Sequence, residues 1–92
     1  MRVLSLLLVF ALVVPLVAQK VPSDDRIYDE VREKLANDPD VRGAGFDITV
    51  KNGVVTLRGM VHTQKAKEKA EKIAKKVKGV TSVDNQLKLF GD

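Results

Sequence analysis

The segment FDITVKNGVVTLRGMV, Phe46 to Val61, is the most informative part of this chain. Apolar and polar residues alternate on both sides of Asn52-Gly53. This dipeptide favours a type I′ turn, because that turn needs a positive φ at both of its central residues. The segment therefore predicts a β-hairpin made of residues 46–51 and 54–61.

The two-residue loop also sets the register of the hairpin. Apolar residues fall opposite one another on one face, in the pairs Phe46–Gly59, Ile48–Leu57 and Val50–Val55. The other face carries the favourable cross-strand pairs Thr49–Thr56 and Asp47–Arg58. A glycine opposite Phe46 leaves room for the ring. We expect one buried face and one solvent face, because a slip of one residue would destroy every pairing.

A helix is predicted before the hairpin. Ser23 or Asp24 can cap it, and its apolar residues recur at helical spacing as Ile27, Tyr28, Val31 and Leu35. Asn37-Asp38-Pro39 ends it, because the residue before a proline avoids the α region. The Asp38-Pro39-Asp40 sequence lacks the spaced ligands of a calcium loop, so we interpret it as a turn, followed by a glycine-containing loop to Gly45.

A second helix is predicted over Gln64–Lys78, capped by Thr63 and ended by Gly79. One narrow arc of this helix is apolar and rich in alanine: Ala66, Ala70, Ile73, Ala74 and Val77. A third strand follows, from Val80 to Leu89. The predicted fold is α+β, an αββαβ two-layer sandwich in which two helices cover one face of a three-stranded mixed sheet.

The first residues differ in kind from the rest. Met1-Arg2, a continuous apolar run interrupted by Pro15, and a small residue at Ala18 together have the layout of a secretory signal. We predict a signal peptide over residues 1–18, cleaved after Ala18, then a linker over 19–22 and a domain over 23–92. The alternative is an uncleaved N-terminal membrane anchor, and in both cases the domain is exported.

Composition excludes several kinds of chemistry. The chain has 92 residues, a formal net charge of +4, one histidine and no cysteine. Disulfides, thiol nucleophiles and zinc–cysteine sites are therefore excluded. His62 has no nucleophile motif beside it, and the sequence contains no phosphate loop, metal-binding histidine pair or serine elbow. We therefore expect no catalysis, no cofactor and no metal, and interpret His62 as an exposed residue at a helix boundary.

The second helix is strongly basic, and some of its lysines share one side. Lys65, Lys69, Lys72 and Lys76 follow an i, i+4, i+7, i+11 pattern beside the apolar arc. Glu68–Lys72 and Glu71–Lys75 are i,i+4 pairs typical of a solvated helix. Solvation alone explains such a helix, but the lysines that share one side also suit anionic phosphate head groups. Nucleic acid is not expected, because the protein is exported and the hairpin lacks exposed stacking aromatics.

The chain resembles the BON domain, a module named from bacterial osmotic-shock and nodulation proteins. The matching residues are the alternating hairpin with Asn52, Gly53 and Gly59, the alanine-faced helix, and Gly79-Val80-x-x-Val83-x-Asn85-x-Leu87. The resemblance implies a periplasmic, non-enzymatic protein linked to osmotic or envelope stress, which associates with phospholipid membranes or envelope proteins. Family members often carry two copies, whereas this chain carries one, so a function needing two sites would require a homo-oligomer.

Two hypotheses follow. The first is binding of an anionic phospholipid surface through Lys65, Lys69, Lys72 and Lys76. The second is a protein-interaction or chaperone-like module that uses a sheet edge or exposed apolar residues such as Val54 and Met60.

Overall fold

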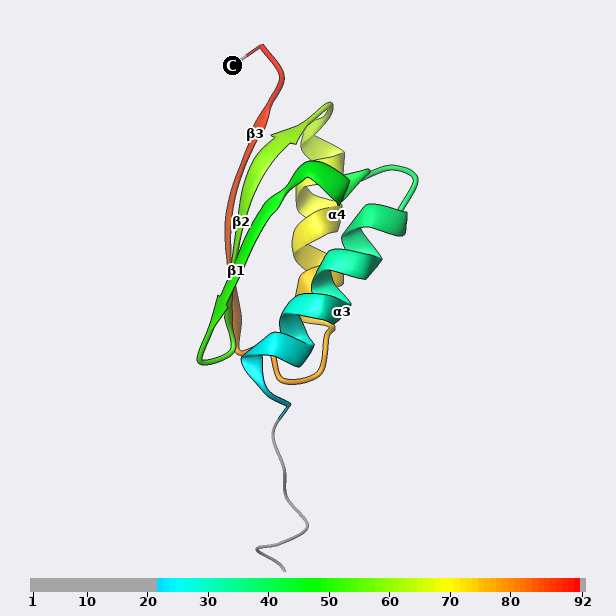
Figure 1. Cartoon of the computed structure of the whole chain (residues 1–92). Coiled ribbons are helices and arrows are strands. Elements are labelled where there is room, and N and C mark those ends of the chain that lie inside the picture. The colour runs from blue at the N-terminus through cyan, green and yellow to red at the C-terminus, as the bar shows by residue number, and fades with distance from the viewer. Residues whose placement is uncertain (1–21, 92) are drawn as a thin grey trace, which may run out of the picture.

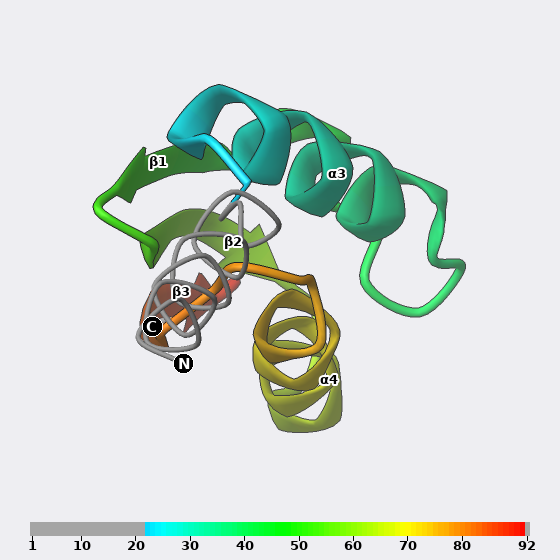
Figure 2. The same cartoon turned by 90° about the horizontal axis from the view of Figure 1, so that it is seen from below.

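The computed structural model describes residues 22–91, and its elements follow the order α3, β1, β2, α4, β3 with a short 3₁₀ turn, η2 (Gly43–Gly45), before the hairpin (Figure 1). The predicted signal peptide, the linker up to residue 21 and Asp92 lie outside these residues. Both helices lie on the same face of a three-stranded sheet, which confirms the predicted α+β sandwich (Figure 2).

Helix α3 (Asp24–Asn37) begins and ends where its sequence predicts. The Ser23 side chain accepts a hydrogen bond from the Arg26 N–H at 3.3 Å, and two aspartates in the first turn favour the positive end of the helix dipole. Ile27, Val31 and Leu35 are fully buried against the sheet.

The hairpin confirms the predicted register. Strands β1 (Asp47–Lys51) and β2 (Val54–Val61) pair antiparallel, with Thr49 opposite Thr56 and Val50 opposite Val55. Asn52 and Gly53 have φ angles of 52° and 82°, as a type I′ turn requires. Strand β1 begins one residue later than expected, but Phe46 still packs over Gly59, where an added Cβ would lie 2.9 Å from the ring.

Helix α4 (Gln64–Lys75) is capped by Thr63, whose hydroxyl accepts the Ala66 N–H at 3.0 Å. The prediction that it extends to Lys78 is wrong. Its last turn tightens into i→i−3 hydrogen bonds, from Lys76 N to Ile73 O and from Val77 N to Ala74 O. The chain therefore leaves the helix early, yet Val77 remains buried and completes the alanine face.

Strand β3 (Ser82–Leu89) runs parallel to β2 and gives the sheet order β1-β2-β3. It begins two residues later than expected, because residues up to Thr81 pack against the hairpin turn: the Thr81 N–H donates to Gly53 O at 2.8 Å. Gly79, at φ 97°, lies so close to α3 that an added Cβ would be 2.9 Å from Ile27 Cδ1. Gly53 and Gly79 are thus sites of close backbone approach.

Candidate functional site

The predicted lysines lie along one side of α4 and its C-terminal cap, and we refer to Lys65, Lys69, Lys72 and Lys76 as the lysine stripe. Lys65, Lys72 and Lys76 are exposed, whereas Lys69 is half-buried. Helical spacing keeps all of them on one flank. The structure thus places three exposed ammonium groups on the same side of the helix.

Lys69 differs from the other members because it is paired within the fold. Its Nζ lies 3.1 Å from Asp38 Oδ2 and 2.7 Å from Asp40 Oδ2. The pairing was not visible from the sequence, since no acidic residue lies three or four positions from Lys69 on its own helix. Hydrogen bonds to Asp40 and Asp38 raise the pKa of Lys69, so it stays charged. Its ammonium group is therefore already neutralised by the loop after α3.

Asp38 organises that loop, as the turn interpretation predicts. Its Oδ1 accepts the backbone N–H groups of Asp40 at 2.9 Å and of Val41 at 3.1 Å. Desolvation works to raise the pKa of Asp38, but the hydrogen bonds from Lys69 and from the two backbone groups outweigh it and hold the pKa below its ordinary value. The loop and α4 are therefore joined by an ionised pair.

The i,i+4 pairs on α4 are only partly as expected. Glu71 pairs with Lys75 at 3.1 Å, and this hydrogen bond, against a smaller desolvation effect, lowers the pKa of Glu71. Glu68 instead accepts a hydrogen bond from Gln64 at 3.2 Å. Among residues 22–91 no carboxylate oxygen lies within 4 Å of Lys72 Nζ, so its charge is free to face solvent.

The opposite flank of α4 is fastened to β3 by a polar contact that sequence reasoning missed. Asn85 points toward the helix layer and donates from Nδ2 to the Lys67 carbonyl at 2.9 Å and to Glu71 Oε1 at 3.3 Å. The lysine stripe lies away from this contact, on the flank that reaches the loop after α3. An alternating strand pattern contains no signal for such a contact, because the partner is 18 residues away.

The predicted structural residues Asn52, Gly53, Gly59 and Gly79 all have positive φ angles. The sequence did not reveal that Asp24 holds the hairpin turn. Its carboxylate accepts the N–H of Asn52 at 2.8 Å and that of Gly53 at 3.0 Å. These residues shape the fold, and of the four predicted ones only Gly59 also lines a groove discussed next.

Two shallow grooves meet at the end of the molecule where α4 begins. One, of about 480 Å³, is lined by Arg42, His62 and Lys65 among others, and the second, of about 370 Å³, shares Arg42 and His62 and adds Met60 and Phe90. As predicted, His62 is exposed at the helix boundary; its ring stacks on that of Phe90 with centroids 4.8 Å apart. Sequence reasoning singled out neither Arg42 nor Phe90 as functional.

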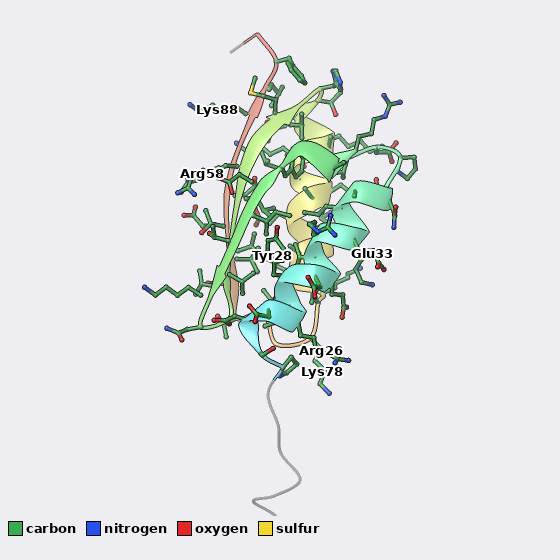
Figure 3. The ribbon with its side chains drawn as sticks, in the orientation of Figure 1. Arg26, Tyr28, Glu33, Arg58, Lys78 and Lys88 are labelled. Atoms are coloured by element: carbon green, nitrogen blue, oxygen red, sulfur yellow. The ribbon has the colours of Figure 1, made fainter. Side chains whose placement is uncertain are left out.

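Neither α3 nor α4 covers the second face of the sheet. Arg58 and Lys88 extend from this face, away from the helices (Figure 3). Val54 and Met60 are 39% and 40% exposed there, as the second hypothesis requires. In the part of the chain that the structure describes, no helix has the length and apolar character needed to cross a membrane. Nor do residues 22–91 gather three or more histidine or acidic side chains that could hold a metal ion.

Comparison with known proteins places the chain in a family. The model of the BON domain matches residues 23–89. Osmotically-inducible protein Y of Escherichia coli (strain K12) is 40% identical over 65 residues, which cover 71% of this chain and 32% of that protein. The chain thus spans about a third of the relative's length. Since the family model covers nearly the whole described structure, this chain belongs to the BON domain family.

Proposed function

We propose that this protein is a non-catalytic periplasmic module that binds the anionic phospholipid surface of the cell envelope and acts in osmotic or envelope stress. Three things support the proposal: the family, the name of the osmotically inducible relative, and the predicted signal peptide. The basic side of α4 supplies the contact.

The observation that carries the proposal is the exposure of Lys65, Lys72 and Lys76 on one flank of α4. Each lysine near an anionic membrane contributes about 1 kcal/mol, and the attraction is screened by salt. Three lysines would therefore give weak, reversible attachment. The apolar face of α4 is buried in the core and is not free to insert into lipid.

The spacing of Lys69 suggests that it binds lipid, but in this proposal it joins α4 to the loop after α3. Because Asp38 and Asp40 already neutralise its charge, Lys69 would contribute little direct attraction to lipid. The stripe therefore acts through its three other members.

Vesicle co-sedimentation across a salt series tests the proposal. The mature chain should bind vesicles that contain phosphatidylglycerol, and this binding should weaken as salt rises. It should not bind vesicles of phosphatidylcholine alone. At about 10 mM salt, where the Debye length of about 30 Å exceeds the length of the stripe, replacing Lys65, Lys72 and Lys76 together by glutamine should weaken binding about 100-fold. The matched control replaces Arg32, Lys51 and Arg58, which are exposed on other surfaces, and should weaken it far less. Equal losses, or equal binding to neutral vesicles, would contradict the proposal.

A second candidate function is protein interaction through the uncovered face of the sheet. The observation that favours it is the exposure of Val54 and Met60 on the face that no helix covers. In that case Val54→Lys would abolish capture of an envelope protein, and the triple lysine variant would still bind it. The reverse pattern would favour the phospholipid function.

A further inference from the structure

The two grooves at the start of α4 are adjacent, because Arg42 and His62 line both, and we consider them together. We refer to the adjacent pair as the end groove. Its walls come from the loop after α3, the junction of β2 with α4, and the C-terminal end of β3, and these three segments lie at the same end of the molecule in Figure 1. Charged side chains dominate one half of the groove, and the other half adds mostly apolar ones.

The charged half of the groove carries two positively charged side chains, Arg42 and Lys65, that form no ion pair within residues 22–91. Asp40 is the acidic residue of its wall, and Lys69 holds that carboxylate at 2.7 Å from outside the groove. Within the described part of the chain, no carboxylate oxygen lies within 4 Å of the charged nitrogens of Arg42 or Lys65. Two cations are therefore available to an anion, against the one net negative charge that Asp38, Asp40 and Lys69 carry together.

Arg42 has an unusual backbone conformation and is held by two hydrogen bonds to the loop. Its φ of 50° lies in the left-handed region, which costs a non-glycine residue about 1 kcal/mol or more. Its N–H donates to Asp38 O at 2.9 Å, and its Nε donates to Pro39 O at 3.2 Å. The guanidinium is thus oriented by the loop that Lys69 fastens to α4, and its terminal N–H groups remain available to a ligand.

The apolar half of the end groove contains two large apolar side chains that are exposed and lie outside the core. Phe90 is 58% exposed and Met60 is 40% exposed, and both line the groove beside Arg42. Exposed apolar and aromatic side chains next to cations suit the boundary where phosphate head groups meet acyl chains. A small soluble anion would use only the charged half, so the whole groove fits a phospholipid better.

We infer that the end groove binds the phosphate of an anionic phospholipid through Arg42 and Lys65, with Phe90 and Met60 entering the head-group boundary beside it. The inference rests on the proposed function for its partner and adds the orientation: the protein docks with this end leading. Lys76 then lies about 16 Å further along α4 than Lys65. This is twice the Debye length of about 8 Å at physiological salt, so Lys76 contributes much less than Lys65.

A pair of single variants tests the orientation. Lys65→Gln and Lys76→Gln remove the same charge from the same stripe, and both positions are exposed. At physiological salt we expect Lys65→Gln to weaken binding to phosphatidylglycerol vesicles about fivefold and Lys76→Gln to change it much less. Arg42→Gln should match Lys65→Gln, and circular dichroism should show that all three remain folded. Equal losses at positions 65 and 76 would overturn the inference.

A fluorescent reporter tests insertion independently of charge. The chain has no tryptophan, so Phe90→Trp introduces a single indole at an exposed position. Its emission should shift to the blue on adding phosphatidylglycerol vesicles and be quenched by brominated acyl chains. As a control, the indole of Lys51→Trp, at the other end of the hairpin, should not respond. An unshifted indole at position 90 on fully bound protein would overturn the inference.

Two further outcomes separate the inference from the proposed function. If vesicles are bound in a salt-sensitive way but Arg42→Gln and the position 90 reporter show no effect, end-on docking is wrong and the phospholipid function stands. If wild-type protein binds no anionic vesicles even at low salt, both are wrong. Replacing chloride by inorganic phosphate at constant ionic strength should leave vesicle binding intact; full displacement would mean a site for free phosphate and would overturn the inference.

Discussion

Asp24 shows how much one side chain contributes beyond its own element. As a first-turn aspartate it complements the dipole of α3, which its sequence position predicts. The same carboxylate also accepts the N–H groups of Asn52 and Gly53, which are 28 and 29 residues away. A left-handed turn leaves these groups without strand partners, so Asp24 satisfies them and fixes the hairpin against the helix.

Replacing Asp24 should therefore destabilise the fold more than its surface position suggests. Asp24→Ala loses two charge-assisted hydrogen bonds, and we expect it to lower the free energy of unfolding by about 1–2 kcal/mol. Asp25→Ala removes the neighbouring exposed aspartate as a control and should change it by less than about 0.5 kcal/mol. Urea unfolding followed by circular dichroism measures both, and equal effects would show that the turn contacts contribute nothing.

The Asp38–Lys69 pair predicts how stability depends on pH. The pKa of Asp38 is lower in the folded protein than its ordinary value, so its ionised form stabilises the fold. That contribution is fully present above about pH 4 and is lost as pH falls through the folded pKa. Lys69 has a raised pKa, so its contribution is present below about pH 10 and is lost as pH rises through the folded value.

Asp38→Asn isolates the charge, because the amide oxygen can still accept the turn hydrogen bonds. The variant should melt below wild type at pH 7, and the two melting temperatures should converge on acidification below about pH 4. Asp29→Asn, on the exposed face of α3, should follow the wild-type pH profile. A gap between Asp38→Asn and wild type that stays constant from pH 7 to pH 3 would assign the effect to something other than charge.

At the scale of elements, the sequence predicts what is local. The hairpin was predicted to the residue pair because alternation and the Asn52-Gly53 turn lie within one short segment. For α4 the sequence predicts an end three residues later than the structure shows, because nothing in Lys76 to Lys78 breaks a helix by itself. Long-range packing ends the helix: the chain must turn so that Gly79 passes Ile27 and Thr81 reaches Gly53.

A pair of glycine substitutions tests this packing. Gly53 has a φ of 82°, and an added Cβ would lie 2.8 Å from the Gly79 carbonyl oxygen. A left-handed backbone alone costs a non-glycine residue about 1–2 kcal/mol. Gly53→Ala should lower the free energy of unfolding by more than this, because the added Cβ also clashes with that oxygen. Gly45→Ala meets no atom within 4 Å and should leave stability unchanged or raise it by about 0.5 kcal/mol. Chemical denaturation measures the stability of both variants. A Gly53→Ala protein as stable as the Gly45→Ala protein would contradict this account.

At the scale of the whole molecule, the candidate site could be predicted only in part. The lysine stripe follows from helical spacing, and three of its members are exposed as that spacing implies. The pairing of Lys69 with Asp40 and the end groove could not be predicted, because each joins segments far apart in sequence. No periodicity within one element shows which loops will lie beside it.

The helix layer is electrically uneven: α3 is mainly acidic and α4 mainly basic. Glu33 on α3 and Ile73 on α4 line a common groove, so Glu33 lies on the side of α3 that faces the lysine stripe. Its negative charge should repel the membrane that the stripe attracts. Removing that charge should therefore strengthen binding, by less than the roughly fivefold that one fully effective charge provides.

Glu33→Gln tests this view of the whole charge distribution. Binding to phosphatidylglycerol vesicles should rise at low salt, and the gain should vanish when salt shortens the Debye length to a few ångströms, about 3 Å at 1 M. Asp84→Asn removes an equal charge from the uncovered face of the sheet, away from the end groove, and should gain much less, because the sheet separates it from α4. If both variants gain equally, binding responds to net charge alone. The helix layer would then have no special part in attracting the membrane.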